Sequence, residues 1–84
     1  MTEQAAPATR WLLSGIVQGV GFRPFVYRLA HQYGLRGWVR NCSGQVEILA
    51  AGPAGQLQAF GSDLLARAPA IARPQLAAKE TLQR

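Results

Sequence analysis

The chain passes from an apolar run into an amphipathic segment through Ile16-Val17-Gln18-Gly19-Val20-Gly21-Phe22-Arg23-Pro24. Gly19 and Gly21 permit backbone conformations that other residues avoid, so successive N–H groups can turn toward one point. Pro24 suits the first turn of a helix, where its missing N–H has no cost, and we predict that a helix begins at about Arg23. The positive end of the helix dipole then faces the loop, and the Arg23 guanidinium adds donors that grip two phosphate oxygens at once. The stretch predicts a strand, an anion-binding loop and a helix, in that order.

A plainer interpretation stays open on these residues alone. Glycines after a strand often form only a turn, and an arginine in the first turn of a helix is often only solvated. The third glycine of the dinucleotide-binding motif is missing, and no Gly-Lys-Ser or Gly-Lys-Thr follows as in a P-loop. If the loop binds an anion, the sequence therefore favours a phosphate that belongs to no nucleotide.

The segments on either side of this stretch have clear periods. Residues 11–17 are apolar on both faces and too short for a usual helix, which is typical of a central strand. Between residues 22 and 33, apolar side chains recur every three or four positions, which predicts an amphipathic helix. Gly34 is placed to end this helix, because glycine adopts the left-handed C-terminal cap conformation at little cost.

Two short alternating segments follow, at residues 35–41 and 45–51, around Cys42-Ser43-Gly44. A short connection that contains glycine joins the strands of a β-hairpin, and one face of each strand is predicted to be buried. Asn41 lies in line with the apolar set of its strand, but at the strand's end. We therefore expect its side chain to reach toward something rather than to pack in the core.

A second helix and a last strand complete the pattern. Leu57, Phe60, Leu64 and Leu65 have helical spacing and should face the same sheet. The final segment is poorly patterned, and we expect only a short edge strand within residues 71–78. The order β-α-β-β-α-β predicts an α+β fold, the ferredoxin-like split βαβ sandwich, with two helices on one face of an antiparallel sheet. This topology hosts many functions and identifies none of them.

The composition points to one small globular domain. Of the 84 residues, 49% are hydrophobic and 15% are charged, which is too apolar for a disordered chain. Residues 1–9 have no period and are predicted to form a flexible leader, so the domain itself is expected at residues 10–84. The single cysteine, Cys42, excludes an internal disulfide and favours a reducing compartment, from which we infer a cytoplasmic location. No apolar run approaches the roughly 20 residues of a membrane span, and we expect no membrane partner.

The charge balance favours an anionic partner. Nine Lys and Arg residues against four Asp and Glu residues give a formal net charge of +5. The arginines are scattered, and no aromatic-rich motif of an RNA-binding sheet is present, so a small phosphorylated substrate fits better than a nucleic acid. Stacking of bases on Trp11, Trp38 and Tyr27 stays an alternative, although aromatic residues on short strands and helices are more often part of the core.

Two motifs resemble the acylphosphatase family: Val17-Gln18-Gly19-Val20-Gly21-Phe22-Arg23 and Gly37-Trp38-Val39-Arg40-Asn41. Both occur in the family's order and separation, and the resemblance extends from about Arg10 to Arg73. It implies hydrolysis of the carboxyl-phosphate bond of an acyl phosphate, with no metal, no cofactor and no covalent intermediate. That reaction is physically reasonable here, because an acyl phosphate carries a good leaving group and the protein mainly has to position water and neutralise phosphoryl oxygens.

The resemblance also implies roles for particular residues. The phosphoryl group would be bound by the loop and helix start, and Asn41 would orient the attacking water. Arg23 and Asn41 are thus the expected catalytic residues. The expected phosphate-binding residues are Gln18, Gly19, Val20, Gly21, Phe22 and Arg23.

Finer detail is similar to one branch of the family. Arg23-Pro24-Phe25-Val26-Tyr27-Arg28-Leu29-Ala30 and Asn41-Cys42-Ser43-Gly44-Gln45-Val46-Glu47-Ile48 resemble the N-terminal acylphosphatase-like domain of the HypF-type carbamoyltransferases, which act in the maturation of nickel-iron hydrogenases. The resemblance implies carbamoyl phosphate as the substrate and downstream domains of a larger maturation protein as partners. An alternative of a different class stays open, namely a module that binds and delivers carbamoyl phosphate, or docks neighbouring domains, with little hydrolysis of its own.

Other residue types give weaker signals. His31, the single histidine, lies on the polar side of the predicted helix and is expected to be solvated rather than to act as a general base. No histidine or third group is placed in the sequence to activate Cys42 as a nucleophile. The four acidic residues are too dispersed for a metal site or an acid-base pair, and we expect them to be solvated.

Overall fold

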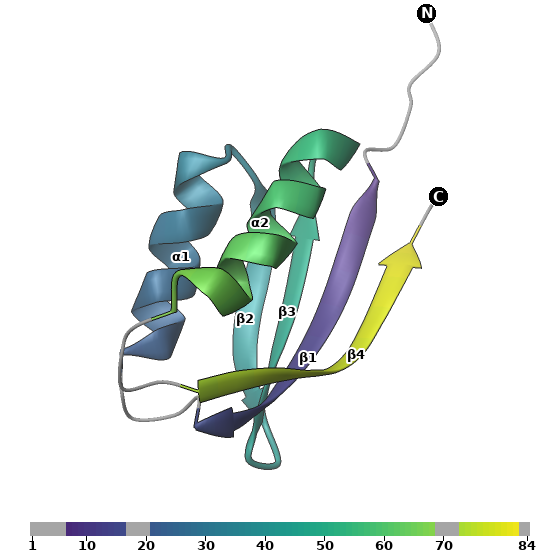
Figure 1. Ribbon diagram of the computed structural model, residues 1–84. Coiled ribbons are helices and arrows are strands. Elements are labelled where there is room, and N and C mark those ends of the chain that lie inside the picture. Colours follow the sequence, from purple (N-terminus) through teal and green to yellow (C-terminus); the bar gives the residue numbers. More distant parts are fainter. Residues whose placement is uncertain (1–6, 17–20, 69–72, 83–84) are drawn as a thin grey trace, which may run out of the picture.

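The computed structural model describes residues 7–16, 21–68 and 73–82. The elements are, in chain order, β1 (Ala8–Ile16), α1 (Phe22–Gln32), β2 (Arg36–Cys42), β3 (Gln45–Ala51), α2 (Ala54–Ala66) and β4 (Arg73–Leu82). Figure 1 shows the strands as one twisted sheet with both helices on the same face. The predicted α+β fold with the order βαββαβ is confirmed. None of the described helices is long and apolar enough to cross a membrane.

The topology of the sheet brings the C-terminal ends of β1 and β2 together. The strand order is β2-β3-β1-β4, and each neighbouring pair is antiparallel. Because β1 and β2 are both antiparallel to β3, they run in the same direction and their C-terminal ends lie at the same end of the sheet. α1 also begins there, since it follows β1 (Figure 1). The fold thus gathers the two predicted motifs at one end of the molecule.

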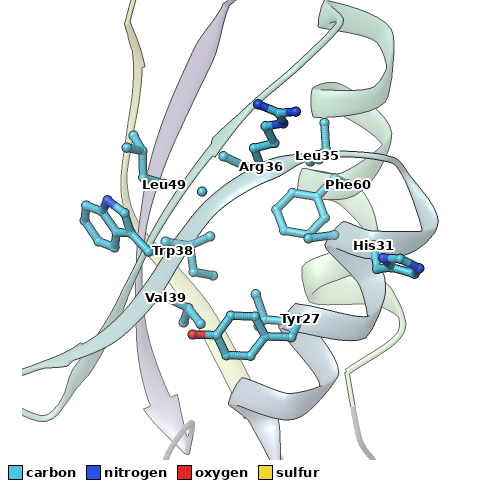
Figure 2. Close-up of a pocket in the computed structure, with 13 residues that line it drawn as sticks. Tyr27, His31, Leu35, Arg36, Trp38, Val39, Leu49 and Phe60 are labelled. Atoms are coloured by element: carbon cyan, nitrogen blue, oxygen red, sulfur yellow. The ribbon is translucent and has the colours of Figure 1, made fainter.

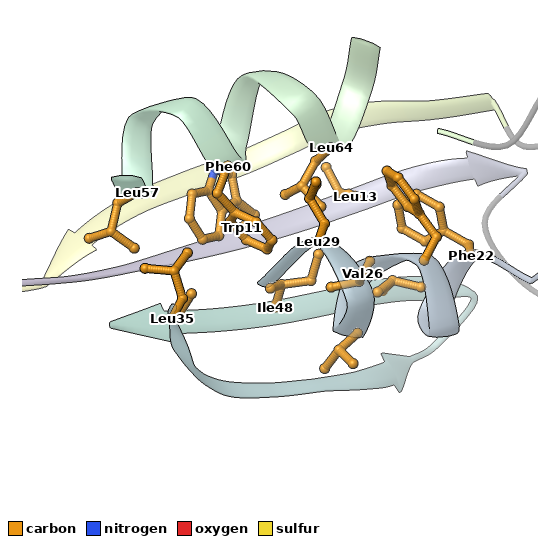
Figure 3. Packing of buried hydrophobic residues seen from close by; sticks show 14 residues of the cluster. Trp11, Leu13, Phe22, Val26, Leu29, Leu35, Ile48, Leu57, Phe60 and Leu64 are labelled. Carbon is orange, nitrogen blue, oxygen red and sulfur yellow. The ribbon is translucent and has the colours of Figure 1, made fainter. Parts of the chain in front are cut away.

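One apolar core lies between the sheet and the two helices (Figure 3). Both predicted helical faces are confirmed except at Leu65, which is exposed. The ring of Trp11 on β1 meets the ring of Phe60 on α2 edge-on, with centroids 5.2 Å apart. The buried apolar side chains are Trp11, Leu13, Phe22, Phe25, Val26, Leu29, Leu35, Val39, Val46, Ile48, Ala50, Leu57, Phe60 and Leu64.

The C-terminal end of α1 is closed by Gly34, as predicted. Gly34 has φ +66°, the left-handed conformation that glycine adopts without strain. Its N–H donates to the carbonyl of His31 at 3.1 Å, and the N–H of Leu35 donates to the carbonyl of Ala30 at 2.9 Å. These two bonds form a Schellman motif, which satisfies the last carbonyls of the helix and directs the chain into β2.

The β2-β3 hairpin turns on Ser43 and Gly44, both with positive φ (52° and 81°). This is the two-residue turn whose twist matches that of paired strands. Near the other end of the hairpin, β2 and β3 approach closely at Gly37, where a Cβ would lie 1.7 Å from the carbonyl oxygen of Leu49. Gly37 is therefore required by this pairing, in addition to belonging to the second motif.

The last strand is longer than the sequence predicted. β4 spans Arg73–Leu82, whereas a short strand within residues 71–78 was expected. The pairing with β1 shifts register between Leu12 and Leu13, which face Ala78 and Leu76, so one extra residue stands in β4. Side chains before and after this irregularity therefore alternate out of phase, and the sequence of β4 lacks the regular alternation that marks a strand. At the other end of the sheet, β1 begins at Ala8, inside the predicted leader, and residues 1–6 lie outside the described residues.

Candidate active site

The start of α1 has the backbone geometry that the first motif predicts. Gly21 lies directly before the helix with φ 77° and ψ 15°, a left-handed conformation. The helix begins at Phe22, one residue earlier than expected, and Pro24 stands in its first turn. Three residues of the predicted phosphate-binding loop, Gln18, Gly19 and Val20, lie outside the described residues.

No side chain caps this end of the helix. Gly21 occupies the N-cap position without a side-chain hydrogen bond, and the first turn contains no acidic residue. The N–H of Phe25 donates to the carbonyl of Gly21 at 3.2 Å, and Pro24 has no N–H. The N–H groups of Phe22 and Arg23 therefore have no partner within the helix. Together with the positive end of the dipole, they favour an anion.

The first two residues of α1, Phe22 and Arg23, have opposite environments. The Phe22 side chain is 1% exposed and packs on Phe25, with ring centroids 5.7 Å apart. Both rings belong to the buried core, which holds the first turn of α1 in place. The Arg23 side chain, next in sequence, is exposed, so its guanidinium is free to reach a ligand in front of the helix.

Asn41 lies at the same end of the molecule. It is exposed in the second-last position of β2 and shares the helix-covered face of the strand with buried Val39. Because β2 ends where α1 begins, the fold brings Asn41 and the first turn of α1 to one end of the sheet (Figure 1). The structure thus brings the two expected catalytic residues to one region, while their roles stay predictions.

Glu47 departs from the expectation that the acidic residues are solvated. It lies on the sheet face without helices, yet it is only 5% exposed. Arg10 on β1 and Arg40 on β2 both donate to its carboxylate, Arg40 at 2.8 Å. These hydrogen bonds, Arg10's first and then Arg40's, hold the pKa of Glu47 below its usual value against the opposing effect of burial. The Arg40 guanidinium also stacks on the ring of Trp38, 4.7 Å from its centroid.

Asp63 is also engaged within the fold. The hydroxyl of Tyr33, just beyond α1, donates to its carboxylate at 2.5 Å and so ties α1 to α2. This hydrogen bond is the main cause that raises the pKa of Tyr33. Arg67, one turn further along, lies 3.6 Å from the same carboxylate. Sequence reasoning missed both Glu47 and Asp63. The partners of Glu47, and Tyr33 as the partner of Asp63, come from other elements, whereas Arg67 is four residues from Asp63 and its ion pair could have been predicted from the spacing.

The remaining titratable groups are dispersed over the described part of the fold. Within the ranges that the structure describes, no group of three His, Cys, Asp or Glu side chains could hold an ion. His31 is exposed in the last turn of α1, at the far end of the helix from Arg23. Cys42 is half-buried next to Asn41, but alternation along the strand directs it to the other face of the sheet.

An α+β sandwich with an uncapped, cationic helix start defines a candidate phosphate-binding domain. The family model for acylphosphatase matches residues 9–83. The chain therefore belongs to the acylphosphatase family.

Relatives fall into two groups of very different length. The chain is 56% identical to carbamoyltransferase HypF2 of Cupriavidus necator over 59 residues, which are 70% of this chain and 7% of that protein. The crystal structure of Bacillus subtilis acylphosphatase matches with a TM-score of 0.78 and 35% identity, over 93% of this chain and 84% of that one. T. kodakarensis HypF matches with a TM-score of 0.82 and 42% identity, over 93% of this chain and 10% of that one. The chain thus spans less than a tenth of HypF2, and the resemblance to both acylphosphatases and HypF proteins is confirmed.

Proposed function

We propose that this chain hydrolyses the carboxyl-phosphate bond of acyl phosphates, with carbamoyl phosphate as its physiological substrate. The observation that carries the proposal is the start of α1. There, left-handed Gly21 leads into an uncapped helix whose exposed Arg23 has no acidic partner among the described residues, and Asn41 lies at the same end of the sheet. A positive helix end and a planar guanidinium are together suited to a phosphoryl group.

In the proposed reaction the protein binds and orients, and the substrate supplies the leaving group. The N–H groups of Phe22 and Arg23, with the Arg23 guanidinium and the preceding loop, hold the phosphoryl oxygens and neutralise the charge on them. Asn41 orients a water molecule in line with the bond that breaks. The water oxygen bonds to phosphorus, the acyl carboxylate leaves, and the proton of the water passes to a phosphoryl oxygen. Carbamoyl phosphate would give carbamate and inorganic phosphate.

The substrate and context rest on the relatives. Similarity to HypF2 and to T. kodakarensis HypF supports carbamoyl phosphate and a role in hydrogenase maturation. Because the chain spans only 7% of HypF2, the partners proposed for it are the further domains of such a protein. A cytoplasmic location belongs to the same proposal, since the single cysteine, Cys42, is free and favours a reducing compartment.

The test is a hydrolysis assay with carbamoyl phosphate and acetyl phosphate in the presence of a chelator. Arg23→Ala should lower turnover by about 10² to 10³, the loss seen when one oxyanion donor is removed. Asn41→Ala should lower kcat more than it raises KM, because the orientation of water matters in the transition state. Arg28→Ala removes another exposed arginine of α1, outside its first turn, and should retain activity.

The same assay decides between hydrolysis and capture. A folded wild-type chain that binds inorganic phosphate or carbamoyl phosphate without turnover would be a delivery module, the second candidate. That candidate is favoured by the small share of HypF2 that the chain spans, because in such a protein the chemistry can reside in other domains. Equal losses in Arg23→Ala and Arg28→Ala would show that net charge, rather than the helix start, governs the reaction.

A further inference from the structure

A hollow of about 200 Å³ lies between α1 and the β2 edge of the sheet (Figure 2). Apolar side chains of the core, among them Val26 on α1 and Val39 on β2, form its floor. Two large aromatic side chains, Tyr27 and Trp38, line it and remain 56% and 40% exposed. Figure 2 shows them on either side of Val39. Large exposed apolar groups around a hollow are typical of an interaction site.

The strand beside this hollow has an open edge. Within the described sheet, β2 pairs only with β3. The two-residue turn makes Cys42 and Gln45 the hydrogen-bonded pair nearest to it, and hydrogen-bonded and non-bonded pairs alternate from there. Gly37 and Val39 fall on non-bonded pairs, so their N–H and C=O groups point away from β3. The hollow therefore lies next to backbone groups that can pair with another strand.

The charge on this edge is positive and unbalanced. α1 and β2 contain no Asp or Glu, and each carboxylate in the described ranges already has a cationic partner. Arg36 lines the hollow at the start of β2, and no described carboxylate lies within 4 Å of it. Exposed arginines alone would serve to keep an edge strand from pairing. They do not explain why two aromatic side chains and a hollow accompany them.

We propose that the β2 edge and this hollow bind an extended acidic peptide segment of a partner protein. The segment adds a strand to β2, inserts one apolar side chain into the hollow and places carboxylates near Arg36. A volume of about 200 Å³ lies below the roughly 300 Å³ at which small-molecule pockets begin, and it suits a single side chain. A nucleic acid fits less well, because it lacks the alternating N–H and C=O groups that pair with a strand edge. The proposal does not depend on hydrolysis at the start of α1.

The probe for this proposal is a synthetic peptide of about six residues, the usual strand length, in which glutamate alternates with valine or leucine. Titration of the full chain, followed by backbone amide shifts in NMR spectra, should move the signals of Gly37 and Val39. Arg36→Glu should weaken binding at least about tenfold, since it places a like charge beside the peptide. Lys79→Glu makes the same charge change on exposed β4, the other outer strand, and should leave binding unchanged. A peptide in which the backbone N–H groups that face β2 are methylated should not bind, because it cannot donate hydrogen bonds to the strand.

Several outcomes would overturn the proposal. One is the absence of binding to a folded chain, and another is undiminished binding of the N-methylated peptide. Equal losses in Arg36→Glu and Lys79→Glu would show that only net charge attracts the peptide. Displacement by saturating inorganic phosphate, with shifts centred on Arg23, would place the peptide at the start of α1 instead. Equal affinity for a single-stranded oligonucleotide of matched charge would show that a backbone edge is not what is recognised.

Discussion

Replacing Gly37 by alanine should destabilise the fold far more than alanine at other glycines. The added Cβ would lie 1.7 Å from the carbonyl oxygen of Leu49 and 2.9 Å from the Cα of Ala50. Real Cβ atoms essentially never approach other atoms below 3.0 Å, so β2 and β3 would have to separate by about 1.3 Å at this point. Both contacted atoms belong to the backbone, so no side-chain rotation relieves the clash.

The expected cost follows from this separation. A shift of this size takes a hydrogen bond of ordinary length beyond the geometric limit, and two such bonds contribute about 2 kcal/mol. Overpacking adds about 1 to 3 kcal/mol. The free energy of unfolding should therefore fall by about 3 to 5 kcal/mol, which is a large share of the roughly 5 to 15 kcal/mol available to a domain. The variant should therefore unfold at a clearly lower urea concentration than the wild type.

Two other glycines serve as controls that separate the steric clash of an added Cβ from the cost of a positive φ. Gly44 has φ 81°, but no atom lies within 4 Å of the position that an added Cβ would take, so Gly44→Ala should cost only about 1 to 2 kcal/mol. Gly55 lies in α2 with open space around it, and Gly55→Ala should stabilise by about 0.5 to 1 kcal/mol. Urea unfolding, followed by circular dichroism and tryptophan fluorescence, measures all three. If Gly37→Ala cost no more than Gly44→Ala, the close approach of β2 and β3 would be refuted.

Three further predictions concern side chains. Hydrogen bonds lower the pKa of Glu47 in the folded chain, so the stabilisation by its carboxylate should be complete above the unfolded-state pKa of about 4.3 and lost as the pH falls below that pKa. The urea midpoint should therefore fall less on acidification in Glu47→Gln than in the wild type. Equal falls in both proteins would contradict the pairing. Tyr33→Phe removes the hydrogen bond to Asp63 and should lower the urea midpoint of unfolding while kcat stays unchanged. A loss of activity would indicate a role beyond packing. His31→Gln should leave kcat within roughly twofold, since the residue lies at the far end of α1 from Arg23. If the wild type showed a bell-shaped dependence of kcat on pH and this variant did not, a reaction without a histidine base would be contradicted.

The fold could be predicted because its local signals agree with its topology. The two-sided apolar run around Leu13 marks a central strand, helical spacing marks both helices, and Gly34 ends α1 where predicted. Each of these signals depends on residues close together in sequence. β4 was the exception, because the register shift opposite Leu12 and Leu13 breaks the alternation on which a strand prediction relies.

The candidate site was predictable in part for the same reason. A left-handed Gly21 and an exposed Arg23 in the first turn follow from a glycine-rich loop before a helix. The buried, doubly paired Glu47 could not be predicted, because its partners stand 37 and 7 residues away and meet it only once the register of three strands is fixed. The hollow beside β2 was missed for a similar reason, since Tyr27 and Trp38 look like ordinary core-edge aromatics until the edge strand is known.

The pairing of Ala8 with Leu82 has a consequence for how such a domain can be attached to other chains. These two residues start the first strand and end the last, so the described chain enters and leaves the domain side by side. They lie at the opposite end of the sheet from the start of α1 (Figure 1). Further sequence joined at either residue would lie at the end of the sheet away from α1's start, so the space in front of Arg23 would stay open to solvent. The domain could thus be attached to a much larger protein with the start of α1 facing outward.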